Sequence, residues 1–301
     1  MIDYKLLEAL RAVCDEGGFE RAARQLSLSQ SAVSQRIKLL EARVGAPVLR
    51  RSTPPSATEL GQQLLNHLRQ VSLLERDLRA RVPGLEAPEQ PERLRLVINA
   101  DSLATWWAAA VGDFCQRHPL LLDLQVEDQD SGLRRLREGD VVACLCSAER
   151  PLAGARSLLL GQMRYLAVAS PTFLARQFAQ GVTGERIARA PAVVFGPEDR
   201  LQQRYLAGLG CEGPQLHHLC PSSEGFVRLI AAGMGWGMVP ALQIRERLAK
   251  GELQELLPGQ FLDVPLYWHY WRNGGELLAQ LTDELARKAP ALLAGEDQAM
   301  R

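Results

Sequence analysis

The stretch FERAARQLSLSQSAVSQRIKLLEARV at residues 19–44 contains two short helical patterns separated by a serine-rich turn. The first pattern, residues 19–26, carries two adjacent alanines that allow another helix to cross closely. Ser29 is a favourable N-cap for the second pattern, residues 30–43, because its hydroxyl can accept a hydrogen bond from a free backbone N–H. The spacing predicts a helix-turn-helix.

The second of these helices has two chemically different faces. Val33, Ile37, Leu40 and Val44 recur at helical spacing and are expected to face a core. Hydroxyls, amides and cations, with no acid before Glu41, cover the rest, as suits contact with base edges in a DNA major groove. A merely solvated helix more often mixes in carboxylates. The candidate DNA-reading residues are Gln30, Ser31, Ser34, Gln35, Arg36 and Lys38.

Basic residues are concentrated around this motif although the whole chain has no net charge, with 35 basic and 35 acidic residues. Seven Lys or Arg residues lie between positions 21 and 51, and a local basic stripe in a neutral protein favours a phosphate-binding surface. The proline-rich segment 45–58 predicts a wing, in which Arg50 or Arg51 reaches the DNA backbone or minor groove.

The flanks of the motif set the expected domain boundaries. A helix at residues 3–15 precedes it, and Thr58 caps a long helix whose leucines repeat every three or four residues up to about position 81. That narrow stripe resembles a coiled-coil seam and predicts a homodimer. We therefore expect a DNA-binding domain at 1–58, a linker and dimerisation helix at 59–81, and a proline-rich hinge at 82–92.

The last two hundred residues alternate between extended and helical patterns, which predicts an α/β domain with parallel strands. Expected strands at 94–99, 121–127 and 141–146 are separated by helices at 102–117 and 131–138. A second such unit begins with an expected strand at 165–169, and the chain returns through an extended segment at 265–270. We expect an effector-binding domain at 93–301 with two lobes around a cleft. Lobe I comprises 93–164 and 268–301, and lobe II comprises 165–267.

Other function classes find little support in the sequence. Catalysis would need a nucleophile with a base, paired acids or a cofactor anchor, and no such set stands out, so neither an enzyme, a cofactor nor a metal site is expected. Cys144 and Cys146 are read as small buried residues, and the glycines of 233–240 as a helix-to-strand turn. No apolar run reaches the ~18–20 residues of a membrane span, and residues 1–5 resemble no signal peptide, so we expect a cytoplasmic protein without a membrane partner.

Three segments at expected strand ends should rim the cleft. Two of them open helices, whose free N–H groups and serines can hold a carboxylate, yet together they contribute five acids. This combination fits a zwitterion with an extra positive charge, such as lysine or arginine. The alternative is that these acids cap helices and face water. The candidate ligand residues are Asn99, Asp101, Ser102, Leu103, Thr105, Glu127, Asp128, Asp130, Ser222, Ser223 and Glu224.

The whole chain resembles the LysR-type transcriptional regulators, most specifically in the motifs at residues 19–26, 29–41, 49–51 and 58–61. The resemblance implies a winged helix-turn-helix, a linker helix and a two-lobed effector domain like a periplasmic binding protein. It also implies that Gln30, Ser31, Ser34, Gln35 and Arg51 match positions that contact DNA. Residues 99–106, 125–128, 222–227 and 266–269 are similar to the ArgP/LysG branch, which senses basic amino acids and activates their export and related metabolism.

The residue patterns and the family resemblance together imply the expected mechanism. A dimer, or a dimer of dimers, would grip an interrupted palindrome in double-stranded DNA. Effector binding would close the lobes and change DNA bending and access of RNA polymerase, provided the ligand prefers one state. Two alternatives remain at this point: a LysR-type regulator with a different small-molecule effector, and a DNA-occupancy protein affecting replication initiation, as one member of the branch is described.

Overall fold

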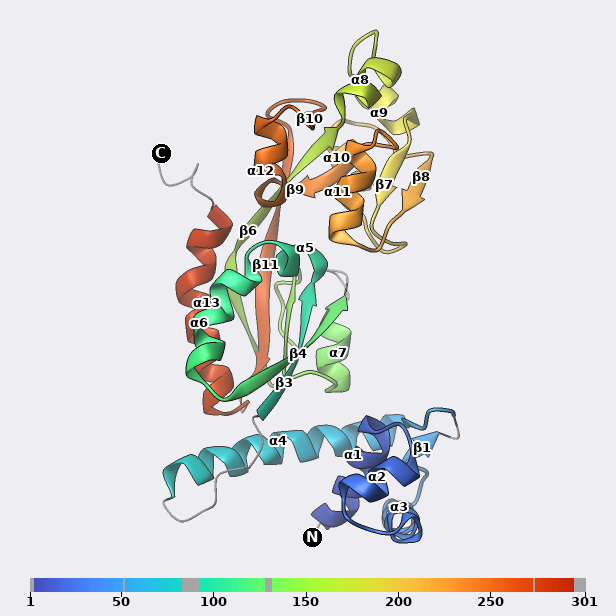
Figure 1. Ribbon diagram of the computed structural model, residues 1–301, viewed down its shortest axis with the longest axis vertical. Helices are drawn as coiled ribbons and strands as arrows, with labels where there is room; N and C mark the ends of the chain where they lie inside the picture. The colour runs from blue at the N-terminus through green and yellow to red at the C-terminus, as the bar shows by residue number, and fades with distance from the viewer. Residues whose placement is uncertain (1–2, 51, 83–91, 128–131, 273, 295–301) are drawn as a thin grey trace.

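The computed structural model describes residues 3–50, 52–82, 92–127, 132–272 and 274–294. A helical N-terminal module and a long helix lie at one end of the molecule, and a two-lobed α/β domain extends away from them (Figure 1). The expected fold class, a helix-turn-helix module followed by a two-lobed α/β domain, is confirmed.

The N-terminal module is small and has its own core. Ser29 caps α3 by accepting a hydrogen bond from the backbone N–H of Ala32 at 3.2 Å, and Gly45 ends the helix in the left-handed conformation (φ 77°). Val33, Ile37 and Leu40 of α3 are buried in the core, as the periodicity predicts. The elements are α1 (Tyr4–Asp15), α2 (Phe19–Gln25), α3 (Gln30–Val44), β1 (Leu49–Arg50), β2 (Ser56–Ala57) and α4 (Glu59–Arg81).

Helix α4 divides its apolar stripe between two environments. Thr58 caps it as predicted, accepting from the N–H of Gly61 at 3.1 Å. Leu68 is only 4% exposed because it completes the core of the N-terminal module, whereas Leu74 and Leu78 are more than half exposed. The stripe expected to form one dimer seam is therefore partly used within the protomer, and only its C-terminal half stays open.

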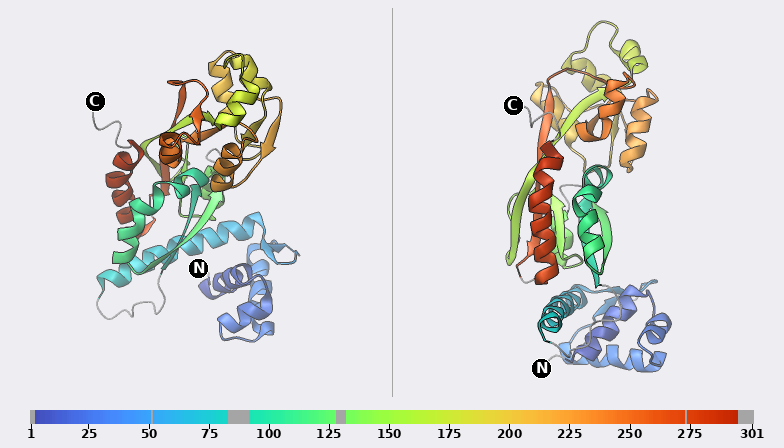
Figure 2. Two further views of the ribbon diagram at one scale, coloured as in Figure 1. Left: turned by 45° about the horizontal axis from the view of Figure 1, so that its top comes forward. Right: turned by 60° about the vertical axis from the view of Figure 1, so that its left-hand side comes forward.

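The two-lobed domain is built on one mixed sheet. Strand β3 pairs in parallel with β4 and β5 in lobe I, while β6 pairs antiparallel with β9, β10 and β11. A separate parallel pair, β7 and β8, lies in lobe II (Figure 2). The strands are β3 (Glu92–Asn99), β4 (Leu120–Glu127), β5 (Ala143–Cys146), β6 (Ala155–Ala169), β7 (Ala192–Val194), β8 (His217–Leu219), β9 (Gly237–Pro240), β10 (Gln254–Glu255) and β11 (Phe261–Trp271).

Helices cover the sheet in both lobes. Helix α13 packs against α6 and β6 in lobe I, so the end of the chain completes the lobe that β3 begins (Figures 1 and 2). The helices of this domain are α5 (Ala100–Ala104), α6 (Trp107–Arg117), α7 (Gly132–Glu138), α8 (Pro171–Gln177), α9 (Gly184–Arg189), α10 (Leu201–Gly208), α11 (Ser223–Ala231), α12 (Ala241–Ala249) and α13 (Gly275–Ala294).

Strands β6 and β11 form a long ribbon that runs through both lobes, and it is longer than the segments 165–169 and 265–270 expected from the sequence. The register shifts between Leu266 and Tyr267, opposite Gly161, whose φ of 151° suits glycine. Buried positions along β6 consequently step from Leu160 to Met163, not by two, which hides the strand from a simple alternation pattern.

The single helix expected at 102–117 is broken into α5 and α6. The hydroxyl of Thr105 donates to the carbonyl oxygen of Asp101 at 2.6 Å, and the chain changes direction there. Both Trp106 and Trp107 are almost completely buried, at 2% and 1% exposure. Consecutive residues of one straight helix point about 100° apart, so a break lets both indoles enter the core.

Candidate ligand pocket and nucleic-acid interface

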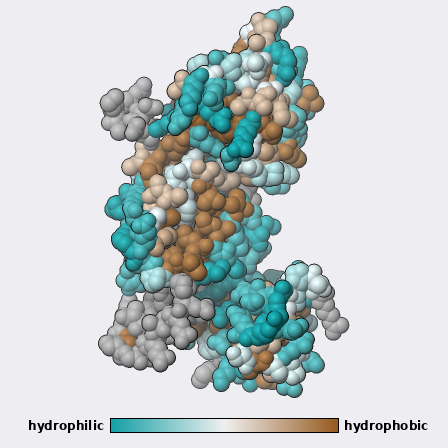
Figure 3. Space-filling view, viewed as in Figure 1, coloured by the Kyte–Doolittle hydropathy of each residue, from teal (hydrophilic) through white to brown (hydrophobic). Residues whose placement is uncertain are grey.

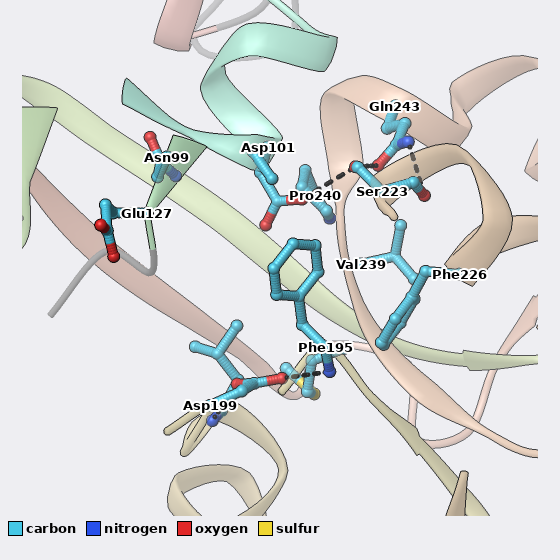
Figure 4. A pocket seen from close by; sticks show the side chains of 13 residues that line it. Asn99, Asp101, Glu127, Phe195, Asp199, Ser223, Phe226, Val239, Pro240 and Gln243 are labelled. Carbon is cyan, nitrogen blue, oxygen red and sulfur yellow. Dashed lines mark hydrogen bonds between the residues drawn. The ribbon is translucent and has the colours of Figure 1, made fainter. Parts of the chain in front are cut away.

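A pocket lies between the two lobes, and interfaces between domains or lobes are where small ligands commonly bind. Lobe I contributes the ends of β3 and β4 with the start of α5, and lobe II contributes β9 and segments around α10, α11 and α12 (Figure 4). The lining residues are Asn99, Ala100, Asp101, Glu127, Phe195, Asp199, Leu201, Ser223, Phe226, Met238, Val239, Pro240 and Gln243.

The pocket is acidic. Three carboxylates line it, those of Asp101, Glu127 and Asp199, and none of the described lining residues is Lys or Arg. Phe195 and Phe226 supply apolar walls from lobe II. Such a surface favours a ligand that carries positive charge and an aliphatic portion.

Asp101 connects three parts of the domain. One carboxylate oxygen accepts a hydrogen bond from the hydroxyl of Tyr165 on β6 at 2.8 Å. The other accepts from the hydroxyl of Ser223, at the start of α11 in lobe II, at 2.9 Å. The amide of Gln243 on α12 donates to the backbone carbonyl of Ser223 at 3.2 Å (Figure 4). Asp101 thus joins lobe I to lobe II at the pocket.

The other two carboxylates are also held in place. Asp199 is 6% exposed and accepts hydrogen bonds from the backbone N–H groups of Phe195 at 3.0 Å and Leu201 at 2.9 Å. Glu127, at the end of β4, accepts from the guanidinium Nε of Arg135 at 2.8 Å. Neighbouring groups from different elements therefore hold these two carboxylates in position.

Four of the residues predicted from sequence line the pocket: Asn99, Asp101, Glu127 and Ser223. Others of the set lie elsewhere: Ser102 is fully buried, Leu103 packs against the main core, Thr105 closes α5, and Ser222 caps α11. Asp128 and Asp130 lie outside the described residues.

Glu224 differs most from the expectation. Its side chain is 76% exposed and forms an i,i+4 ion pair with Arg228 on the outer face of α11. It therefore matches the alternative in which an acid of the rim faces water. The reason is helical geometry, because Glu224 is rotated by about 100° from Ser223, which faces the pocket.

Several lining residues were not predicted, among them Phe195, Asp199, Phe226 and Gln243. Asp199 follows β7 and Gln243 follows β9. These strands lie beside the expected cleft because β6 carries the chain from lobe I into lobe II. The available signal was the turn at 233–240, which forms the predicted helix-to-strand connection and puts Val239 and Pro240 against the pocket.

The N-terminal module exposes a polar face of α3. Gln30, Ser31, Gln35 and Lys38 are exposed, and Ser34 and Arg36 are partly exposed. By helical geometry Ser31, Gln35 and Lys38 lie opposite the buried Val33 and Ile37, while Gln30 and Arg36 lie at the two borders of the polar face. Arg50 is exposed on β1 of the wing, and Arg51 lies outside the described residues. The candidate DNA-reading residues that the structure describes are thus all at least partly accessible to solvent.

Three further expectations from the sequence concern membrane spans, metal sites and the cysteines. Throughout the described ranges, no helix is long and apolar enough to cross a bilayer. Nor does any group of three or more His, Cys, Asp or Glu side chains gather there as a metal site would require. Cys144 and Cys146 are buried in β5 as free thiols, at 0% and 1% exposure.

Comparison with known proteins places both parts of the chain in one family. Residues 4–62 match the model of the bacterial regulatory helix-turn-helix protein of the lysR family, and residues 88–288 match the LysR substrate binding domain. The HTH-type transcriptional regulator ArgP of Pseudomonas fluorescens is 67% identical over 287 residues, covering 95% of this chain and 96% of that protein.

Solved structures give the same assignment. The crystal structure of ArgP from Mycobacterium tuberculosis superposes with a TM-score of 0.83 at 36% identity, covering 98% of this chain and all of that one. Full-length LysG from Corynebacterium glutamicum, with the bound effector Arg, gives a TM-score of 0.72 at 36% identity, covering 96% and 98% of the two chains. The chain therefore belongs to the LysR family of DNA-binding transcriptional regulators.

Proposed function

We propose that this regulator senses a basic amino acid, lysine or arginine, in the pocket between its lobes and controls genes for the export or metabolism of that amino acid. The ligand is bound and released without chemical change. Effector binding alters how a dimer, or a dimer of dimers, holds an interrupted palindromic operator in the cytoplasm, and hence how RNA polymerase engages the promoter.

One observation carries the proposal: the pocket presents Asp101, Glu127 and Asp199 without a compensating Lys or Arg among its described lining residues. Carboxylates that line a partly buried site favour a cationic ligand. We assign the α-ammonium to Asp101 and the side-chain cation to Glu127 and Asp199. The first N–H groups of α11, next to Ser223, are suited to the α-carboxylate. The arginine bound to LysG supports the same ligand class.

Titration calorimetry and thermal shift on the full-length protein test this proposal. A ligand present at ~100 times its Kd stabilises the folded state by about 2.7 kcal/mol. Lysine and arginine should both raise the melting temperature. Norleucine, which keeps the aliphatic chain of lysine but lacks the terminal cation, should bind far more weakly, because it cannot make the charge-assisted contacts with the pocket carboxylates.

The same measurements, together with a promoter reporter assay, address the two alternatives. If an anionic or aromatic metabolite stabilises the protein and no basic amino acid does, the effector belongs to another class. If no metabolite binds and reporter output follows DNA occupancy alone, the protein acts as a DNA-occupancy factor, as in the control of replication initiation. A reporter that responds to lysine or arginine only when Asp101 is intact supports the proposal.

The DNA contacts and the assembly are proposed on separate grounds. Gln30, Ser31, Ser34 and Gln35 are assigned to bases, and the basic residues Arg36, Lys38, Arg50 and Arg51 to bases or phosphates. Homo-oligomers are supported by the exposed Leu74 and Leu78 of α4. They are also supported by an apolar area visible on lobe I (Figure 3). On the sheet-edge strand β4, Leu121 and Val126 are each about half exposed.

A further inference from the structure

Helix α7 lies between the pocket and the linker helix α4. It follows β4, whose last residue Glu127 lines the pocket, and it ends at Glu138, just before Gly139 and Asp140, which contact α4. Leu136 of α7 is fully buried in a core cluster of lobe I, so the helix is anchored to that lobe. Polar side chains around α7 therefore connect two functional parts of the regulator.

Arg135 of α7 bridges two carboxylates. Its Nε donates to Glu127 Oε1 at 2.8 Å, and its Nη1 donates to Asp140 Oδ2 at 3.4 Å. The side chains of both acids are about four-fifths buried, with exposed fractions of 19% and 22%. The hydrogen bond with Glu127 is the main cause that raises the pKa of Arg135 above its ordinary value. Glu127 is thus the stronger of the two partners.

The loop after α7 is bound tightly to α4. Gln62 Nε2 donates to Asp140 Oδ1 at 2.5 Å, Asn66 Nδ2 donates to the carbonyl oxygen of Glu138 at 2.5 Å, and Arg69 donates to the carbonyl oxygen of Gly139. Gly139 has a φ of 68°, and a Cβ there would lie about 2 Å from the amide of Asn66. Close docking of the loop on α4 therefore depends on this glycine.

We propose that Glu127, Arg135, Asp140 and Gln62 form a relay through which occupancy of the pocket changes the docking of the linker helix on lobe I. This inference rests on the proposed function, since it assigns a cationic ligand to Glu127. Arg135 is a positioning residue in the relay.

The direction of the effect follows from competition for the carboxylates. A ligand cation at Glu127 weakens the hold of Glu127 on Arg135. The guanidinium then pairs with both oxygens of Asp140 in the bidentate geometry that arginine favours. Turning towards the guanidinium moves Asp140 Oδ1 away from Gln62, and the contact between α4 and the loop loosens. The linker helix, and with it the DNA-binding module, gains freedom to change its angle to lobe I.

A double-mutant cycle on the full-length protein tests the relay without any ligand. Hydrogen–deuterium exchange is measured at α4 residues 59–70 for wild type, Glu127→Gln, Arg135→Ala and the double variant. Glu127→Gln should accelerate exchange there about fivefold or more, because it releases Arg135 to compete for Asp140. Arg135→Ala should not accelerate exchange, because it removes the competing guanidinium, and the double variant should exchange no faster than Arg135→Ala. Arg247→Ala is the matched control, because it breaks an ion pair with Glu252 in lobe II and its side chain is equally exposed (37%).

A second arm uses lysine and operator DNA. In wild type the affinity for lysine should differ at least fivefold between free and DNA-bound protein, since coupling is reciprocal. This ratio should fall to about one in Arg135→Ala and should be partly restored in Arg135→Lys, which retains the cation. If α7 only stabilises lobe I, Arg135→Ala should lower the melting temperature without changing this ratio.

The outcomes separate the two proposals. Additive effects in the cycle, or exchange in Glu127→Gln no faster than in Arg247→Ala, would overturn the relay even if lysine binds. Non-additive effects at α4 in a protein that binds neither lysine nor arginine would support the relay and reject the proposed effector. If Arg135→Ala does not fold, the cycle is run with Arg135→Lys and Gln62→Leu and is judged by the same criterion.

Discussion

Replacing Asp101 by asparagine is the most informative single change in the pocket. The carboxylate accepts hydroxyl hydrogen bonds from Tyr165 and Ser223 and is assigned to the α-ammonium of the ligand. Asparagine keeps the shape and one acceptor oxygen, and the hydroxyl that faces its NH2 group can turn to accept. We therefore expect the two-lobed fold to persist while the negative charge is lost.

The magnitude follows from the charge-assisted contact that asparagine cannot make. Such hydrogen bonds contribute roughly 1.5–3 kcal/mol, which corresponds to a roughly 10- to 150-fold loss of affinity. Titration calorimetry with lysine on the full-length variant measures this loss directly. Operator binding by the ligand-free protein should change little, because Asp101 lies in the pocket and not on the α3 surface.

The matched control is Asp123→Asn. Asp123 is also a paired carboxylate, bound to the Nε of Arg95 at 2.7 Å, but it lies along β4 and does not line the pocket. It should bind lysine like wild type. If Asp101→Asn binds lysine within threefold of wild type, the assignment of the α-ammonium to Asp101 is refuted. If Asp123→Asn loses as much affinity, the effect reflects the charge of the lobe as a whole.

Three further predictions concern other surfaces. Ser34→Ala and Gln35→Ala should each weaken operator binding by about 1–3 kcal/mol per lost base contact and leave binding to random DNA nearly unchanged, and equal losses in a fluorescence titration would contradict base reading. Leu78→Glu should produce monomers in sedimentation analysis, since Leu78 is 54% exposed on α4, and a fully dimeric variant would locate the dimer contact elsewhere. The basic side chains of Arg287 and Lys288 lower the pKa of Glu284 from 4.5 to about 2, so its ionised form favours the folded state. That contribution is complete above pH 4.5 and is lost as the pH falls towards 2; Glu284→Gln should flatten the dependence of the melting temperature on pH in this window.

The N-terminal module could be predicted from sequence because its determinants are local. Helical spacing identifies the buried Val33 and Ile37, and the N-caps Ser29 and Thr58 lie next to the helices that they start. The acidic character of the pocket could also be predicted from the sequence, because residues at the ends of β3 and β4 meet at the carboxyl edge of parallel strands.

The rest of the pocket depends on contacts between distant residues. Asp101 is 64 positions from Tyr165 and 122 positions from Ser223, and no periodicity connects them. Gly161 shifts the alternation of β6, so the strand that brings lobe II into position was only partly visible. The sequence could not show that Leu68 of the linker helix is buried while Leu74 is exposed. The apolar stripe is continuous in sequence, and only tertiary packing divides it.

The pairing of β11 with β5, and of α13 with α6, also has a consequence for biosynthesis. Lobe I contains strands made early and a covering helix made last, with Leu281 and Leu285 of α13 fully buried. The N-terminal module needs only neighbours within the first eighty or so residues, and domains generally fold in order as the ribosome releases them. A nascent chain can thus display its α3 surface well before lobe I closes around its core. A chain that stops short of α13 would carry the DNA-reading module without a finished sensor.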